Sequence, residues 1–577
     1  MPGLYIKSEY DVRSLVDNIG NGEIGLPKLQ RAFIWPSKKV RDLFDSMYKG
    51  YPVGNLMLWK ERRPIDYRPI GYNQQQNSPS LLILDGQQRL TSLFAVVKGK
   101  EVLRDNLRKE LIKIAFDPLK EEFKVADAST TRSSFFINNI SDYFTCPEGN
   151  HEFINSYLEN LSSKHDLSDN EKRKIASSLN KLWALTSYSF TAIVLDADIE
   201  EEEAAEIFVR VNSKGIVLKQ ADFILTLLSI HWDEGRAQIE EFCSNALINN
   251  GRTSPFNYFI NPTPDQLLRV IVGYGFKRAR LKYIYQILLG KDLETGEITI
   301  ENRNAQFEIY KIAQSKTLND QTWHDFLTCI SSAGYLCKNM ISSENTLLYC
   351  YALYLIGKYE YNVSNRDLHE VMKQWFFMSS ITRRYTSSPE SQFEKDISIL
   401  PAYKTPSEFV NALSKRCDVE LTNDFWSVKL PNELITTSTT SPAFCAYQAA
   451  LVILDAKALF SDIKVSTLLN PATSANRSIE KHHLFPKEYL NRIGISDDRR
   501  RNQVANLTLV WWSVNMDILD KSPSSYIEQV SFKPSSEDLE LHALPDEWVN
   551  LEYDEFLDKR RFQMANVIRE AYEMIQK

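Results

Sequence analysis

The N-terminal third of the chain alternates between helical and strand-like spacing of its apolar residues. Residues 12–19 place Val, Leu, Val and Ile on one face of a helix, and Ser8 with Asp11 resembles a capping box at its start. The same spacing predicts a second helix over residues 40–47. The aliphatic run 81–84, followed by Asp-Gly, is typical of a buried strand that enters a tight turn. The chain therefore begins as mixed α/β structure.

Helical spacing dominates the chain beyond this strand. Residues 90–97 predict a helix, residues 188–196 a strand and residues 200–211 an acidic helix. From 216 to 430 the pattern is almost wholly helical, with many aromatic residues and few glycines or prolines, which predicts a helical connector or scaffold. An amphipathic helix is expected to close the chain at residues 554–575.

The pattern divides the chain into three predicted domains. Residues 436–442 form a small polar run that is typical of a linker, and a length of 577 residues fits three or four domains. We expect a mixed α/β domain over residues 1–230, a helical connector over residues 231–435 and a third domain over residues 436–577.

Composition excludes several classes of protein. Hydrophobic residues make up 43% and charged residues 25%, which rules out a disordered, collagen-like or coiled-coil chain. The seven scattered cysteines never form C-x-x-C, so neither a structural zinc site nor a disulfide framework is expected. No apolar run reaches the length of a membrane span and no secretory signal is visible, so we expect a cytoplasmic protein without a membrane partner. The net charge of −7 argues against non-specific coating of nucleic acid but not against a local basic groove.

The predicted strand and helix around residue 86 bring polar groups to a place that suits a phosphate. Backbone N–H groups are free at a helix start, and the helix dipole favours an anion there. Gly86 lets the backbone approach closely, Arg89 could pair bidentately with a phosphate, and Asp85 could hold a metal ion or orient a water. A plainer alternative is an Asp N-cap joined to the Arg by a salt bridge.

Aromatic and basic clusters in the helical middle each have two interpretations. The tyrosines between residues 349 and 361 are expected to be core and helix-contact residues rather than a base-stacking surface. The basic cluster at residues 277–280 and the pair Arg383-Arg384 could contact phosphates or lie on solvated helix faces.

Two adjacent histidines near the C-terminus indicate metal-assisted phosphodiester hydrolysis. Neighbouring side chains of a strand point to opposite faces, so His482 and His483 would not readily bind one metal together. One can ligate a divalent cation, which neutralises charge on the phosphate, while the other, with a pKa near ~6.5, takes a proton from water. Histidine pairs also occur in ordinary loops, but Asn506 and Asn515 downstream sharpen the pattern.

Three N-terminal segments, in order, resemble the N-terminal domain of the GmrSD family of modification-dependent (type IV) restriction enzymes. They are Gln30-Arg31-x-Phe33-x-Trp35, Asp85-Gly86-Gln87-Gln88-Arg89 and Phe208-x-Arg210-x-Asn212-x-x-Gly215-x-x-Leu218. The resemblance implies a ParB/sulfiredoxin-like fold that binds and hydrolyses an NTP, either ATP or GTP, in a process coupled to DNA restriction. The nucleotide-pocket candidates that it implies are Gln30, Arg31, Asp85, Gly86, Gln87, Gln88, Arg89, Arg210 and Asn212. Among these, Asp85 and Arg89 are also candidate catalytic residues.

The C-terminal segment resembles the HNH (ββα-metal) nuclease motif in the variant found in GmrSD-type proteins. By this resemblance, the expected fold is a ββα-metal domain within a helical surround. His483 matches the general base and His482 the first metal ligand. Asn515 matches the second metal ligand, and Asn506, the middle Asn, braces the loop between the two strands.

Two further features concern the metal and the DNA. Many members of the family have an acidic residue where this chain has His482, and imidazole suits Mn, Ni or Zn better than Mg, which leaves the divalent metal open. Lys521 fits the subfamily spacing and is a candidate DNA contact. The charged run 497–501 could grip DNA or be a solvated turn.

The first functional hypothesis is an NTP-regulated, metal-dependent DNA endonuclease that restricts modified phage DNA in anti-phage defence. A homodimer would help a single HNH site to cut both strands. The alternative is a nucleotide-controlled DNA-binding sensor with an inactive HNH module. A third hypothesis is a phosphotransfer site in a toxin-like system.

Overall fold

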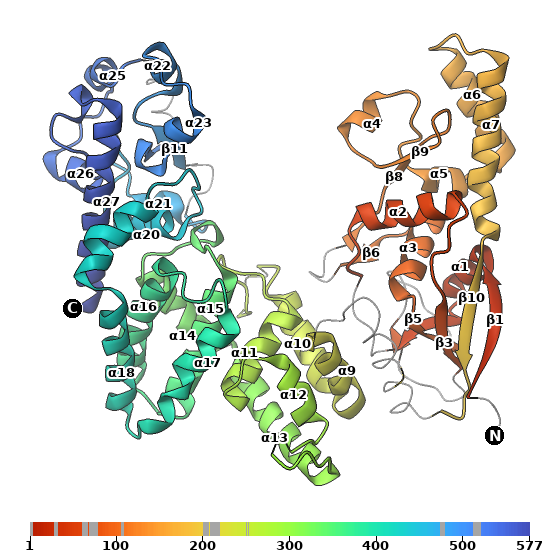
Figure 1. The fold of residues 1–577 in the computed structure, drawn as a ribbon, viewed down its shortest axis with the longest axis horizontal. Helices are drawn as coiled ribbons and strands as arrows, with labels where there is room; N and C mark the ends of the chain where they lie inside the picture. Colours follow the sequence, from red (N-terminus) through yellow and green to blue (C-terminus); the bar gives the residue numbers. More distant parts are fainter. Residues whose placement is uncertain are drawn as a thin grey trace. The chain divides into compact units, whose positions relative to one another are not determined.

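The computed structural model describes most of the chain and divides it into two compact units. The described residues are 4–27, 33–60, 67–68, 79–104, 109–199, 207, 220–249, 251, 253–292, 294–473, 479–511 and 521–577. Unit 1 is Met1–Gln238 and unit 2 is Ile239–Lys577 (Figure 1). Both are rich in helix, and unit 1 also contains a small mixed sheet. No helix in the described ranges has the length and apolar character needed to cross a membrane.

A six-stranded sheet organises unit 1. Its order is β1-β10-β3-β5-β2-β4. The strands are β1 (Tyr5–Asp11), β10 (Ser189–Leu195), β3 (Leu56–Lys60), β5 (Leu81–Asp85), β2 (Ile24–Pro27) and β4 (Tyr67–Arg68). Neighbours β10 and β3 run parallel, as do β5 and β2, whereas the other pairs run antiparallel. The sheet is therefore mixed, and β1 is at one end of its order.

Three amphipathic helices supply much of the core of unit 1. They are α1 (Val12–Gly20), α2 (Ser37–Tyr48) and α3 (Gln87–Lys98), and their apolar faces join one buried cluster with the central strands. The remaining elements are β6 (Val102–Leu103), β7 (Lys109–Glu110), β8 (Ile114–Asp117), β9 (Glu122–Val125), α4 (Ala128–Arg132), α5 (Ile140–Phe144), α6 (Asn150–Ser162), α7 (Asp169–Trp183), η1 (Ala184–Ser187) and α9 (Gln220–His231). Helix α10 (Asp233–Asn245) spans the boundary between the units.

The start of α1 differs from the expected capping box. Ser8 lies inside β1, where it is paired with Ala192 of β10. The chain is therefore still extended at Ser8, and the N-cap is Asp11, whose carboxylate accepts a hydrogen bond from the backbone N–H of Ser14 at 2.7 Å. The expected helix is present, but its cap is formed by the second residue of the pair.

Unit 2 is a helical assembly that contains a two-stranded hairpin. Its first part comprises α11 (Pro264–Phe276), α12 (Leu281–Leu288), α13 (Ile300–Thr317), α14 (Asp320–Ser332), η2 (Lys338–Met340), α15 (Glu344–Tyr359), α16 (Asn365–Ile381), α17 (Pro389–Ser398), η3 (Leu400–Ala402), α18 (Pro406–Glu420), η4 (Phe425–Lys429) and α19 (Leu430–Glu433). Its second part comprises α20 (Pro442–Ile453), α21 (Val465–Leu469), β11 (Ile479–His483), α22 (Lys487–Arg492), α23 (Asp498–Arg501), η5 (Val504–Asn506), β12 (Leu507–Trp511), α25 (Pro523–Gln529), α26 (Ser536–Leu541), η6 (Trp548–Asn550) and α27 (Tyr553–Gln576).

The two parts of unit 2 pack together rather than being separated by an extended linker. Helix α16 contacts both α20 and α27. Within the polar run 436–442, Ser441 is buried and caps α20 by accepting a hydrogen bond from the N–H of Phe444, and the carbonyl of Thr436 accepts one from Val504. Tyr349, Tyr351 and Tyr354 of α15 are buried, as core residues should be, whereas Tyr359 is half-buried. Residues 239–577 thus share one compact unit.

Candidate functional site

The turn between β5 and α3 depends on Gly86. This glycine is the N-cap of α3 and adopts φ 95° and ψ 6°, in the left-handed region. A Cβ atom at this position would lie 2.4 Å from Cδ2 of Leu56. Only glycine fits both requirements, and its small size brings the backbone of the helix start close against β3.

Arg89 lies one turn into α3 and is held beside this glycine turn. Its Nη1 donates a hydrogen bond to the carbonyl of Val53 at 2.8 Å, and its Nη2 is 3.4 Å from Oδ2 of Asp85. Burial lowers the pKa of Arg89, and the nearby Asp85 carboxylate opposes that effect. The sequence left open the alternative of an N-cap at Asp85 joined to Arg89 by a salt bridge. The ion pair between Asp85 and Arg89 is present, but the N-cap is Gly86 and not Asp85.

Gln88 links the α3 turn to the segment that contains Trp35. Its side-chain oxygen accepts hydrogen bonds from the backbone N–H groups of Ile34 at 2.8 Å and Trp35 at 3.1 Å. Gln88 and its neighbour Gln87 are both buried. Two of the three segments that carry the family resemblance therefore meet in space. The other predicted pocket residues, Gln30, Arg31, Arg210 and Asn212, lie outside the described residues.

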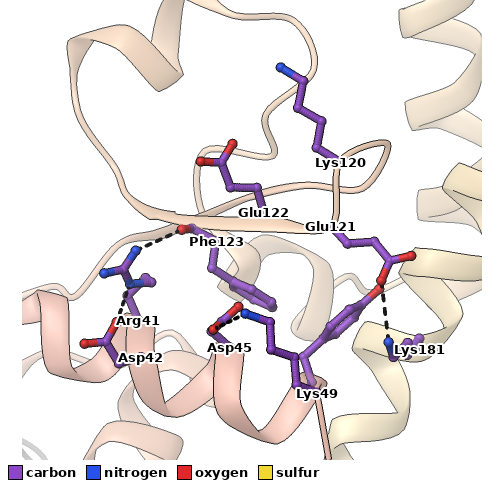
Figure 2. A pocket seen from close by; sticks show the side chains of 10 residues that line it. Arg41, Asp42, Asp45, Lys49, Lys120, Glu121, Glu122, Phe123 and Lys181 are labelled. Carbon is purple, nitrogen blue, oxygen red and sulfur yellow. Dashed lines mark hydrogen bonds and ion pairs between the residues drawn. The ribbon is translucent and has the colours of Figure 1, made fainter.

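A separate polar cavity of about 730 Å³ opens in unit 1 between α2, the β8–β9 turn and α7 (Figure 2). Its four basic side chains are matched by four acidic ones, and most of them pair with each other, as Lys49 does with Asp45 and Lys181 with Glu121. The charged residues are Arg41, Asp42, Asp45, Lys49, Lys120, Glu121, Glu122 and Lys181. This balance gives no excess positive charge to select a phosphate, and no predicted nucleotide residue lines the cavity.

Replacing Gly86 with alanine should destabilise unit 1 by about 1–3 kcal/mol, because the new methyl group would clash with Leu56 in a backbone conformation that already disfavours a side chain. Gly50→Ala is the matched control, because Gly50 also has a positive φ of 73° but nothing lies within 4 Å of its Cβ position. Urea unfolding of both variants would measure the difference. Equal losses would show that the contact with Leu56 has no energetic importance.

The second candidate site is the hairpin of β11 and β12 in unit 2. The strands are antiparallel, with His482 opposite Thr508 and His483 opposite Leu507. The two histidines are adjacent in a strand, so their side chains point to opposite faces. His482 is 8% exposed, whereas His483 is half-buried. Their environments differ, as two separate roles would require.

His483 is held in a neutral state. Burial lowers its pKa to about 4, and the cationic neighbours Lys487 and Arg501 add to this effect, while a hydrogen bond with Asn502 opposes it. That bond joins Nε2 of His483 and Oδ1 of Asn502 at 3.1 Å. A neutral imidazole can accept a proton near pH 7, which is what a general base must do.

Asn506 connects the two strands through their flanking loops. It is fully buried, and its side-chain oxygen accepts from the N–H of Phe485 at 2.9 Å. Its Nδ2 donates to the carbonyls of Phe485 and Arg501, both at 3.0 Å. The residues just after His483 are thereby fixed to the residue that precedes β12. Of the other predicted residues, Lys521 donates to Gln529 at 2.6 Å, and Asn515 lies outside the described residues.

Two residues that support the hairpin were not singled out from the sequence. Arg560 of α27 is fully buried and donates through Nη1 to the carbonyls of Ala505 and Leu507, at 2.7 and 2.9 Å. His542 is also fully buried and bonds through Nδ1 to Oγ1 of Thr508 at 3.0 Å. The only signal in the sequence was that Arg560 falls on the buried face of an amphipathic helix.

The buried His542 should make unit 2 less stable in acid. Burial lowers its pKa to about 4 from an unfolded value of 6.5, so the stabilisation is complete above about pH 6.5. As the pH falls from about 6.5 to about 4, this stabilisation should decrease by at most about 1.4 kcal/mol per pH unit. In urea unfolding at pH 7 and pH 5, His542→Gln should lose less stability on acidification than the parent does, by about 1–2 kcal/mol. Exposed His151→Gln is the control, and parallel pH curves for His542→Gln and parent would contradict the expectation.

The described residues contain no group of three or more His, Cys, Asp or Glu side chains that could hold a metal ion. His482 can contribute one imidazole nitrogen from the hairpin. A metal bound there would take its remaining ligands from other kinds of donor, such as an amide oxygen, water or a phosphate of the substrate.

Comparison with known proteins bears on unit 1 directly. Residues 12–229 match the family model of the GmrSD restriction endonuclease, N-terminal domain. This match supports a relationship between this chain and restriction enzymes of the GmrSD type. The region it covers includes β5, Gly86, α3 and the bonded segment at Trp35, so the site built around Arg89 lies inside the GmrSD-like domain.

A second comparison extends over nearly the whole chain. An uncharacterized protein of Methanocaldococcus jannaschii is 20% identical over 549 residues, which are 90% of this chain and 87% of that protein. The similarity thus extends over most of both units of this chain. A GmrSD-type restriction family implies nuclease activity and DNA as the partner.

Proposed function

We propose that this chain is an NTP-regulated, metal-dependent DNA endonuclease that restricts modified phage DNA. The observation that carries the proposal is the combination, on one chain, of a GmrSD-like N-terminal domain and a braced hairpin that presents a neutral histidine. The N-terminal match supports restriction, and the hairpin supplies the chemistry that restriction requires. The activity would be exercised in the cytoplasm, where incoming DNA appears.

In this proposal the hairpin hydrolyses the phosphodiester. His483 accepts the proton of the attacking water, since its imidazole is neutral at physiological pH. Asn502 orients the ring, and Asn506 holds the loop that comes after it. A divalent metal held by His482 and Asn515 would neutralise charge on the scissile phosphate. Imidazole ligation favours Mn, Ni or Zn, while Mg remains a candidate. Lys521 would contact the DNA backbone.

The N-terminal domain would bind the nucleotide at the start of α3. The positive end of the dipole of α3 suits a phosphate, and Gly86 permits close approach of the backbone. Arg89 is oriented by Val53 and Asp85, and Gln88 anchors the adjacent segment. Gln30, Arg31, Gln87, Arg210 and Asn212 would complete the pocket. Either ATP or GTP would serve as the nucleotide, and its hydrolysis would control cleavage.

One observation favours the alternative of a nucleotide-controlled DNA-binding sensor with an inactive HNH module. Within the described ranges, no three His, Cys, Asp or Glu side chains converge on a metal position. A site with a single imidazole and an amide from the protein would bind metal weakly. The sensor would bind DNA without metal and would not nick it.

A cleavage assay distinguishes the two functions. Unmodified plasmid, DNA with glucosylated hydroxymethylcytosine and phosphorothioate DNA would be incubated with the protein, with Mg²⁺ or Mn²⁺ present or absent, and with or without ATP or GTP. The endonuclease should cut at least one of these DNAs only with metal, at a rate that changes with NTP. Metal-independent DNA binding with NTP turnover, and no nicking of any substrate, would favour the sensor.

A further inference from the structure

The strand at one end of the sheet in unit 1 has exposed apolar residues. Strand β1 pairs with β10 on one side and is terminal in the order of the strands that the structure describes (Figure 1). Leu4, Tyr5 and Ile6 are 58%, 51% and 49% exposed. An exposed seven-residue edge strand with apolar side chains is a template for pairing with another strand.

The hydrogen bonds to β10 determine which backbone groups of β1 face outward. The N–H of Asp196 donates to Leu4, and the N–H of Val12 donates to Tyr188, both at 3.1 Å. In an antiparallel ladder, bonded residues alternate with residues whose N–H and C=O groups point away. The even-numbered residues of β1 are therefore bonded to β10, and the odd-numbered ones, 5, 7, 9 and 11, direct their backbone groups to the open edge.

The charges along this edge are self-complementary. Lys7 and Glu9 are exposed and flank Ser8, and neither forms an ion pair with a described residue. If two copies of β1 pair antiparallel about a two-fold axis through Ser8, Lys7 of each copy lies opposite Glu9 of the other. The same register pairs Tyr5 with Asp11, so all outward-facing backbone groups meet in bonded pairs. On the other face, Ile6 packs against Tyr10.

Other registers are less favourable. A shift by two residues in one direction places Lys7 opposite Lys7, and a shift by two in the other direction places Glu9 opposite Glu9. Like charges directly opposite each other destabilise a strand pair. The register centred on Ser8 also has the longest overlap, because it uses the whole of β1.

We propose that two copies of this chain form a homodimer by antiparallel pairing of their β1 strands about Ser8, which joins the two sheets into one. The interface uses none of the residues proposed for cleavage or nucleotide binding, so its test is independent of theirs. Because it is isologous, each charge pair occurs twice.

Charge reversal tests the proposal with a built-in control. Lys7→Glu and Glu9→Lys each convert two opposite-charge pairs into two like-charge pairs, and each should weaken dimerisation about tenfold or more. The double variant K7E/E9K restores both attractions and should dimerise like the parent. Within a single copy, residues 7 and 9 lie opposite Ile193 and Thr191, so none of these changes creates a charge conflict inside the sheet.

Sedimentation velocity over a range of concentrations would measure the mass of each species. The parent and the double variant should approach twice the monomer mass of 66.7 kDa at concentrations where both single variants remain monomeric. Amide hydrogen exchange should show that residues 4–12 become protected as the concentration of the parent rises. A parent that stays monomeric, or a dimer that both single variants leave intact, would overturn the proposal.

Discussion

His483→Ala should lower the rate of DNA cleavage by about 10²–10⁴-fold, because in the proposed mechanism it removes the group that accepts a proton from the attacking water. Binding of DNA and turnover of NTP should change little, since neither depends on that proton transfer in the proposed mechanism. The imidazole is neutral near pH 7, because burial lowers its pKa to about 4, and its ring is hydrogen-bonded to Asn502. Cleavage kinetics with the metal and NTP that activate the parent would measure the loss.

His369→Ala is the matched control for that measurement. His369 lies on α16 and bonds to Ser332 and Glu370, so its removal tests whether loss of any histidine in unit 2 impairs the protein. Thermal unfolding of both variants would show whether they remain folded. A folded His483→Ala protein that cleaves DNA at the rate of the parent would refute the assignment of His483 as the base.

Asp396→Asn should destabilise unit 2 by about 3–5 kcal/mol, because it removes the buried carboxylate partner of Arg384 and leaves that guanidinium only the more exposed carboxylate of Glu420. Both side chains are at most 5% exposed. Asp396 accepts hydrogen bonds from Nε of Arg384 at 2.8 Å and from the hydroxyl of Tyr385 at 2.6 Å, and it also pairs with Nη2 of Arg384. The amide group of asparagine would turn a donor towards some of these donors.

An exposed ion pair in the same unit provides the comparison. Asp462 pairs with Lys457 at 2.6 Å, but its side chain is 74% exposed. Asp462→Asn should therefore cost less than about 1 kcal/mol. Urea unfolding of both variants measures the two losses under the same conditions. If the two substitutions lowered the free energy of unfolding equally, burial would not explain the importance of the ion pair between Arg384 and Asp396.

Periodicity in the sequence predicted the elements that bury one continuous face. Helices α2 and α3 and strands β5 and β10 lie where their apolar spacing placed them. Strand β1 was missed because most of its side chains are exposed on both faces, so no alternation marks it. The formation of β1 depends on pairing with β10, which lies far along the chain. Because this pairing keeps Ser8 extended, the N-cap of α1 is Asp11 and not Ser8.

Partners that are distant in the sequence also limited the prediction of sites. Arg384 was expected to contact phosphate or to lie on a solvated face, but it is buried against Asp396 and also bonds to Glu420. Asn506 was singled out from its motif, whereas Arg560 could not be, because its role depends on the carbonyl groups that it contacts some fifty residues away. Short motifs identify residues that act locally and miss the residues that support them from other elements.

The support that α27 gives to the hairpin determines whether the two strands could keep their structure after transfer to another protein. Arg560 ties the carbonyl groups of Ala505 and Leu507, on either side of Asn506, to a helix near the end of the chain. The hydroxyl of Tyr526 on α25 holds the carbonyl of Leu484, just after His483. A segment cut around the two strands alone would lose both anchors. The two strands therefore depend on helices outside the hairpin. A chimaera that contains the hairpin must also contain α25 and α27.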